Sequence, residues 1–95
     1  MAIVQMITFR TQAGTGDAFA AGFAPIVAAV RKEPGCRRYE LYRKVDSADT
    51  FVMLERWADQ ASLDSALKLF PGREHPSVAF LQHLAGAPER ERYEV

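Results

Sequence analysis

The hydrophobic pattern of the first third of the chain predicts a strand followed by a helix. Residues 2–10 are rich in β-branched and large apolar side chains, which favour a strand. After Asp17, the expected N-cap, apolar residues recur at three- and four-residue spacing, which is typical of one buried helical stripe. The Pro-Gly pair at 34–35 ends this helix. Pro25 lies inside it and removes one backbone hydrogen bond, so we expect a kink or a loosened turn near Gly22.

The middle of the chain predicts a β-hairpin whose second strand is apolar on both faces. Residues 36–45 and 50–57 form the expected strands, and the polar segment 46–49 forms the turn between them. Because side chains alternate along a strand, the residues of 50–57 divide into two sets. One face carries Phe51, Met53, Glu55 and Trp57, and the other carries Val52 and Leu54. A strand of this kind needs cover on both sides.

The last third predicts two helices and a final strand. Asp59 is the expected N-cap of the first helix. Its apolar stripe consists of Leu63, Ala66, Leu67 and Phe70. A second, short helix is expected to begin near His75, with Pro76 at its favoured first position. Residues 89–95 alternate enough to form a strand, with a frayed terminus as the alternative.

This order of elements, βαββαβ, predicts an α+β fold of the ferredoxin-like type with its helices on one face of the sheet. The strands at 2–10 and 50–57 are expected at the centre because they are apolar on both faces. The strands at 36–45 and 89–95 are rich in Arg and Glu, as exposed edge strands should be. Helices on one face leave the other face of the central strands uncovered, so we expect a homodimer packed sheet against sheet.

Composition narrows the class of protein without naming a function. A chain of 95 residues predicts one domain spanning 1–95. Twelve basic and twelve acidic residues cancel without forming blocks of one sign, so no nucleic-acid partner is expected. The N-terminus does not resemble a signal peptide and no apolar run is long enough to span a bilayer, so we expect a cytoplasmic protein without membrane contact. Cys36, the single cysteine, is interpreted as a small buried hydrophobe beside a turn.

The segment at 33–67, with its sequences EPGC, RYELYR and FVMLERW, resembles the antibiotic biosynthesis monooxygenase (ABM) family. The resemblance implies a homodimeric α+β barrel, with a small-ligand pocket between helices and sheet in each subunit. It also implies one of several activities. The family includes cofactor-independent oxygenases of quinols and polycyclic phenols, haem-degrading enzymes and enzymes that process small signalling molecules.

Two departures from the family pattern limit what the resemblance implies. Many members carry a histidine on the helix after the tryptophan, at the position of Ala66 here. A second family histidine has its nearest counterpart in His75, which follows an apparent insertion near 68–74. The haem-degrading branch uses an asparagine together with tryptophan and histidine, and this chain contains no asparagine. Haem degradation is therefore not expected.

The candidate ligand-binding residues lie mainly on the strand at 50–57. The resemblance assigns the face of Phe51, Met53 and Trp57 to the pocket, where Trp57 would form a flat wall for a planar ligand; the alternative is a tryptophan that only fills the core. Glu55 on the same face is a candidate base, because burial raises the proton affinity of a carboxylate. A structural ion pair with Arg38, Arg43 or an arginine of the tail is the alternative for Glu55.

The remaining candidates are histidines and tyrosines. His75 is a candidate proton acceptor, or else a residue of a solvated loop at a helix start. Tyr39 is a candidate catalytic residue and Tyr42 a candidate ligand-binding residue, although they point to opposite faces of their strand and at most one can enter the pocket. His83 is interpreted as a surface or interface residue. Two histidines without a nearby cysteine or acid cluster do not predict a metal site.

These observations favour a monooxygenase that uses no cofactor and acts on a quinol or a polycyclic phenol, an aromatic small molecule. A deprotonated phenol of this kind can itself reduce oxygen, so the protein need only bind it, remove a proton and exclude water. Two alternatives remain open. One is a noncatalytic dimeric module that binds or interacts, which the alanine at 66 favours, and the other is a non-oxidative isomerase or cyclase using the same cavity.

Overall fold

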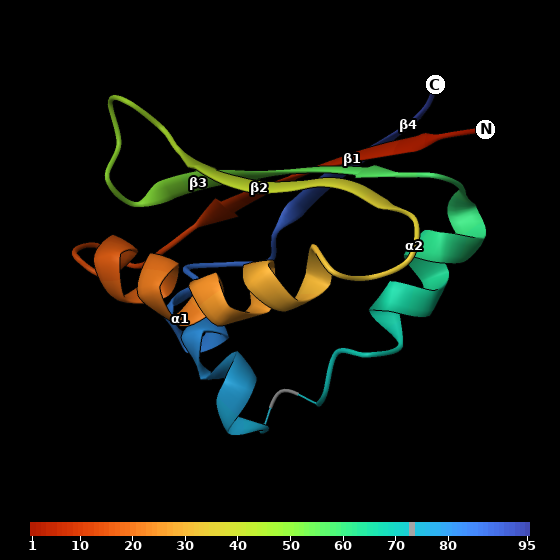
Figure 1. Cartoon of the computed structure of the whole chain (residues 1–95). Coiled ribbons are helices and arrows are strands. Elements are labelled where there is room, and N and C mark those ends of the chain that lie inside the picture. Colours follow the sequence, from red (N-terminus) through yellow and green to blue (C-terminus); the bar gives the residue numbers. More distant parts are fainter. Residues whose placement is uncertain (73) are drawn as a thin grey trace.

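The computed structural model describes residues 1–72 and 74–95, which form an antiparallel sheet with all helices on one of its faces (Figure 1). The α+β class and the ferredoxin-like order predicted from the sequence are confirmed. The elements are β1 (Ile3–Arg10), α1 (Gly16–Val30), β2 (Cys36–Arg43), β3 (Thr50–Trp57), α2 (Gln60–Leu67), the 3₁₀ helix η1 (Pro76–His83) and β4 (Glu89–Glu94).

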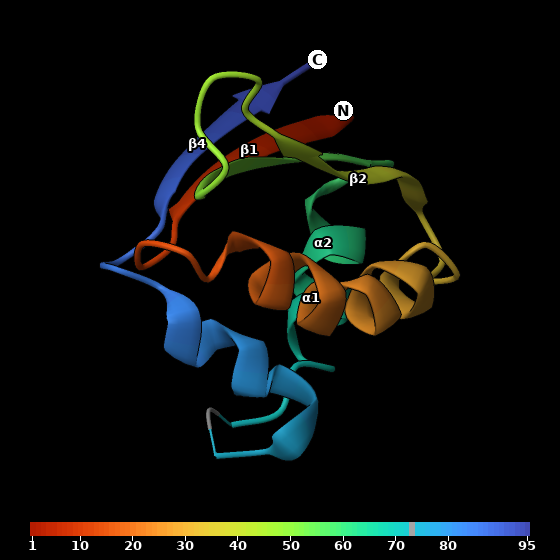
Figure 2. The same cartoon turned by 90° about the vertical axis from the view of Figure 1, so that its left-hand side faces the viewer.

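The strands are arranged in the order β2-β3-β1-β4, so β1 and β3 are central, as their apolar character predicted. β1 pairs with β3 from Ile3 opposite Trp57 to Arg10 opposite Thr50. The tail forms β4 along the other side of β1, which confirms the strand and excludes the frayed terminus. Figure 2 shows β4 and β2 on opposite sides of the molecule, with α1 and α2 beneath the sheet.

The start of α1 differs from the prediction. Asp17 is not the N-cap but lies in the first turn, where it accepts a hydrogen bond from Arg43 at 2.8 Å. The carboxylate of Asp49, in the turn between β2 and β3, instead accepts from the backbone N–H groups of Gly14 and Gly16 at 3.1 and 2.9 Å. These contacts lower the pKa of Asp49. The helix start is therefore capped by a side chain from another part of the chain, which no local pattern encodes.

The middle of α1 is set by a close contact with η1. The helix is continuous through Pro25. At Gly22 an added Cβ would lie only 2.5 Å from the Cβ of Phe80, so the two helices can approach this closely only because residue 22 has no side chain. Beside this contact the rings of Phe23 and Phe80 stack with their centroids 4.6 Å apart. The core that results is strongly aromatic and also includes Phe9, Phe19 and Phe51.

The helices that follow β3 begin as predicted. Asp59 caps α2 by accepting a hydrogen bond from the backbone N–H of Ser62 at 2.8 Å. The short helix after it is η1, in which His75 is the N-cap and Pro76 the first residue. Within residues 1–72 and 74–95, no helix is long and apolar enough to cross a membrane.

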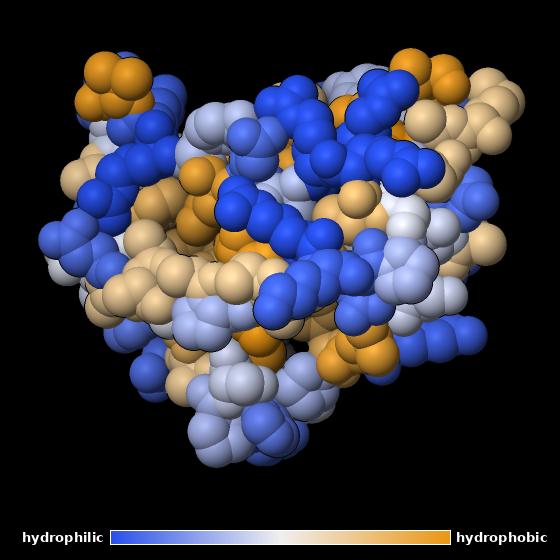
Figure 3. All heavy atoms as spheres, viewed as in Figure 1, coloured by the Kyte–Doolittle hydropathy of each residue, from blue (hydrophilic) through white to orange (hydrophobic). Residues whose placement is uncertain are grey.

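The face of the sheet opposite the helices has no cover within the described chain. Its centre is apolar and partly exposed, with Val4 and Met6 from β1 and Val52 and Leu54 from β3. The β2 edge has a different character: Figure 3 views the molecule from this side, and hydrophilic residues cover much of the upper half, where β2 lies. The edge at β2 therefore differs from the open face, whose centre is apolar.

Candidate active site

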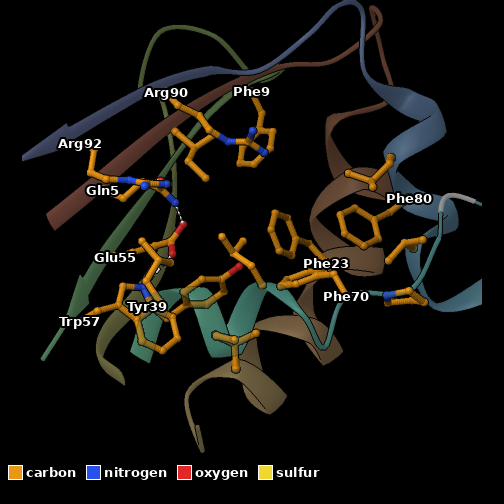
Figure 4. Close-up of a pocket in the computed structure, with 18 residues that line it drawn as sticks. Gln5, Phe9, Phe23, Tyr39, Glu55, Trp57, Phe70, Phe80, Arg90 and Arg92 are labelled. Atoms are coloured by element: carbon orange, nitrogen blue, oxygen red, sulfur yellow. Dashed lines mark hydrogen bonds between the residues drawn. The ribbon is translucent and has the colours of Figure 1, made fainter. Parts of the chain in front are cut away.

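A cavity of about 280 Å³ lies between the covered face of the sheet and the helices. The strands contribute its polar groups, and the helices with the segment after α2 contribute mainly hydrocarbon (Figure 4). In the close-up, Gln5, Glu55, Tyr39 and Trp57 lie on one side and Phe23, Phe70 and Phe80 on the other, with Phe9 beside Arg90 at the top. A ligand with one polar end and an aromatic body fits this division.

Glu55 is the central polar group of the cavity. Its side chain is only 4% exposed, and it accepts hydrogen bonds from the indole N–H of Trp57 at 2.9 Å and from the amide of Gln5 at 3.1 Å. Burial raises the pKa of Glu55, while the two hydrogen bonds and the charges of Arg90 and Arg92 act in the opposite direction. A carboxylate with raised proton affinity next to a cavity is suited to accept a proton from a bound molecule.

The ion pair considered for Glu55 is not formed with any of the three expected partners. Arg38 donates to Glu40 at 2.6 Å, and Arg43 donates to Asp17. A tail arginine, Arg92, does approach, but it donates both of its hydrogen bonds to the Oε1 of Gln5, at 2.7 and 3.1 Å. Within the part of the chain that the structure describes, the donors to Glu55 are therefore two neutral groups.

Tyr39 lies beside Glu55 and points its hydroxyl into the cavity (Figure 4). The side chain is 5% exposed, and burial together with the negative charge of Glu55 raises the pKa of Tyr39. The phenol therefore stays protonated at neutral pH and is available to donate a hydrogen bond to a ligand oxygen.

The other predicted ligand-binding residues are only partly brought together. Trp57 lines the cavity and is also fully packed, at 1% exposure, so its position is compatible with either role considered for it. Phe51 and Met53 share its face but lie in the closed core, away from the cavity lining. Tyr42 lies on the opposite face of the sheet, 46% exposed, where its hydroxyl accepts a hydrogen bond from Arg38. Strand alternation places Tyr42 there, because Tyr39 occupies the covered face.

His75 lies outside the cavity lining. Its Nδ1 accepts a hydrogen bond from the backbone N–H of Ser77 at 3.1 Å, so the ring caps η1 at an exposed position. This corresponds to the alternative of a helix-start residue. The apparent insertion at 68–74 separates His75 from α2, and within it residue 73 lies outside the described residues. His83 is half-buried at the end of η1 and does not line the cavity either.

Three polar residues of the site were missed by the sequence interpretation. Gln5 is only 2% exposed and occupies the buried face of β1 between Ile3 and Ile7. A single amide on the apolar face of a strand is the sequence signal that points to Gln5 as a site residue. Arg90 and Arg92 line the cavity from β4, although the charge pattern of the tail predicts only an exposed edge strand. Their pairing opposite Ile7 and Gln5 directs them to the covered face, and this pairing requires the register of the sheet.

Metal ligands are not gathered anywhere in the described chain. Among residues 1–72 and 74–95, no group of three or more His, Cys, Asp or Glu side chains is arranged to hold a metal ion. Cys36 is partly buried, and burial raises the pKa of its thiol, so it is neither a preformed ligand nor an activated nucleophile.

Comparison with known proteins places the chain in a family. The profile described as "Antibiotic biosynthesis monooxygenase" (ABM) matches residues 2–69. The protein of Bacillus subtilis (strain 168) named "Putative monooxygenase YcnE" is 48% identical over 33 residues, a segment that spans 35% of each chain.

Solved structures show the same fold over nearly the whole chain. SnoaB from Streptomyces nogalater, described as a cofactor-independent oxygenase, is 20% identical with a TM-score of 0.78 and covers 99% of this chain and 92% of its own. A conserved protein of Methanosarcina mazei Go1 is 20% identical with a TM-score of 0.82, covering 98% and 91%. Because the family profile spans most of the sequence, the chain belongs to the antibiotic biosynthesis monooxygenase family.

Proposed function

We propose that the protein is a monooxygenase that oxidises a quinol or polycyclic phenol, with Glu55 as the base. The observation that carries this proposal is the buried carboxylate of Glu55, which faces a largely apolar cavity and, among the described residues, receives hydrogen bonds from two neutral donors. A base in such a site takes up the phenol proton in surroundings that exclude water.

The chemistry balances with the quinol and oxygen as the only reactants. Transfer of a proton to Glu55 leaves an electron-rich quinolate, which passes electrons to O₂. One oxygen atom then bonds to a ring carbon and displaces its hydrogen, and the other leaves as water, so that a naphthoquinol and O₂ give a hydroxynaphthoquinone and H₂O. The substrate supplies all the electrons, so this reaction needs no cofactor. Tyr39 donates a hydrogen bond to the second oxygen of the substrate.

The size of the cavity favours the smaller substrates within this class. Its volume of about 280 Å³ lies at the lower limit of the range of about 300–1,000 Å³ that is typical for drug-sized ligands. A bicyclic ring system with its hydroxyl group near Glu55 would place the remaining ring against Phe23 and Phe80. The name of SnoaB as a cofactor-independent oxygenase supports the reaction type, and the similarity to it concerns the fold alone.

The protein acts as a homodimer in this proposal. The apolar centre of the open sheet face, which includes Met6 and Leu54, supports a second copy packed against it, since monomeric proteins rarely leave such a patch in water. The cavity lies on the other face of the sheet, so each subunit carries its own cavity residues.

The test is oxygen uptake with a series of naphthoquinols and anthrone-type phenols, comparing the wild type with Glu55→Gln. We expect kcat/KM to fall by about 100-fold or more in the variant, the contribution usual for a general base. Glu94→Gln makes the same change on an exposed strand position and serves as the control with unchanged uptake. Uptake at the buffer rate with every substrate, or equal rates in Glu55→Gln, would refute the proposal.

A noncatalytic binding module is the second candidate, favoured by Ala66. This residue lines the cavity where many family members carry a histidine, so the wall opposite the strands offers hydrocarbon in place of a proton-handling group. Quenching of Trp57 fluorescence by a hydroxynaphthoquinone without any oxygen uptake would support this alternative.

A further inference from the structure

A row of hydrogen bonds joins three side chains on three adjacent strands: Arg92 on β4, Gln5 on β1 and Glu55 on β3. Arg92 donates from Nε and Nη2 to Oε1 of Gln5 at 3.1 and 2.7 Å, and Nε2 of Gln5 donates to Oε2 of Glu55 at 3.1 Å. Figure 4 shows these three side chains on the same side of the cavity. The row joins residues 87 and 50 positions apart in the sequence, through paired positions of β4, β1 and β3.

The orientation of the Gln5 amide follows from its partners. A guanidinium group has only donors, so the amide atom that faces Arg92 must be the oxygen. The NH₂ group of Gln5 must then face Glu55. At 2% exposure Gln5 depends on protein partners for its hydrogen bonds, and the opposite orientation would direct its NH₂ group at the donors of Arg92.

This orientation matters because an amide can either donate to a carboxylate or accept from a carboxylic acid. A donor directed at the carboxyl group stabilises its ionised form, whereas a carbonyl oxygen in the same place would stabilise the protonated form. Trp57 offers only a donor to the other oxygen of Glu55. The choice between carboxylate and acid therefore depends on which end of Gln5 faces Glu55.

We propose that Arg92 locks the amide of Gln5 in the donating orientation, and that this lock keeps Glu55 a carboxylate able to accept a proton. Gln5 and Arg92 are then positioning residues for the base, and neither needs to touch the substrate. The catalytic meaning of the lock rests on the proposed function, while the lock itself concerns the ligand-free protein.

Among residues 1–72 and 74–95, the other groups around Glu55 do not offer an equivalent switch. Arg90 on β4 lowers the proton affinity of Glu55 through its charge alone and makes no hydrogen bond to it within the described chain. On β2, Tyr39 and Cys36 are titratable but neutral, since burial raises the pKa of each. The cavity residues contributed by α1, α2 and η1 are all apolar and carry no titratable group.

The fluorescence of Trp57 gives a direct measurement of this lock. It is the only tryptophan of the chain, and its indole N–H donates to Glu55, so its emission should change as Glu55 is protonated. The midpoint of emission against pH is measured in ligand-free protein, with Glu55→Gln as the variant in which this transition disappears. We expect Gln5→Met to raise the midpoint by about one pH unit, the shift expected when a carboxylate loses one neutral donor.

A double-mutant cycle separates the lock from simple charge. Arg92→Met should also raise the midpoint in the wild-type background, because the freed amide can turn its oxygen toward Glu55. In the Gln5→Met background the same substitution should have less than half that effect, since no amide remains to be locked. Arg90→Met is the control and should raise the midpoint equally in both backgrounds.

Two results would overturn the proposal: an unchanged midpoint in Gln5→Met, or an equal effect of Arg92→Met in both backgrounds. The rate of oxygen uptake measured against pH then tests whether the lock matters for catalysis. In each variant, the acidic limb of this pH–rate profile should move in the same direction as the fluorescence midpoint. A shifted midpoint with an unmoved limb would refute Glu55 as the base and leave the lock in place.

Discussion

Replacing Gly22 by alanine tests whether the contact between α1 and η1 makes this substitution destabilising rather than stabilising. In an isolated helix this change stabilises by about 0.5–1 kcal/mol, because glycine loses more backbone freedom on folding. Here the new Cβ would meet the Cβ of Phe80 at 2.5 Å and its Cγ at 3.3 Å, so the helices must separate. Overpacking of this kind costs about 1–3 kcal/mol, and we therefore expect a net loss of roughly 1–2 kcal/mol.

Urea unfolding at a fixed protein concentration, followed by the fluorescence of Trp57 and by circular dichroism, measures this loss. Ala21→Gly, at an exposed neighbouring position of α1, reports the helix propensity alone and should cost about 1 kcal/mol. A Gly22→Ala protein that is more stable than the wild type, by the amount that Ala21→Gly loses, would refute the close packing of α1 on η1.

Three further outcomes concern the cavity and the open face of the sheet. Trp57→Phe should lower the free energy of unfolding by about 2–4 kcal/mol, because it removes packed ring volume and one hydrogen bond to a buried carboxylate; a urea titration showing a loss under about 0.5 kcal/mol would contradict this. The pKa of Glu55 is higher in the folded state than in the unfolded state, so the folded state binds the proton more tightly. As the pH falls from above the folded pKa to below the unfolded pKa, the wild type should therefore gain stability relative to Glu55→Gln. Equal pH dependence of the two proteins in thermal unfolding would exclude this linkage. Leu54→Asp should place an unpaired charge in the proposed dimer interface and yield monomer or unfolded protein in size-exclusion chromatography, whereas an unchanged dimer would show that the open face is not the interface.

Local patterns in the sequence were sufficient for the elements and their order. The apolar character of both faces of β1 and β3 predicted their central positions, since such strands need cover on both sides. Asp59 was identified as the cap of α2 because capping involves residues three apart in the chain. The same locality explains the failure at α1, where the capping carboxylate comes from Asp49 in a distant turn.

For the polar residues of the site, local sequence patterns were again sufficient for some positions and not for others. Strand alternation determined from the sequence that Glu55 and Trp57 share a face and that Tyr39 and Tyr42 do not. Only the tertiary structure decided that Gln5 and Arg92 join Glu55 and that His75 stays outside the cavity lining. Contacts of this kind depend on the register between strands far apart in the sequence and on the path of the chain after α2, and neither leaves a periodic signal in the sequence.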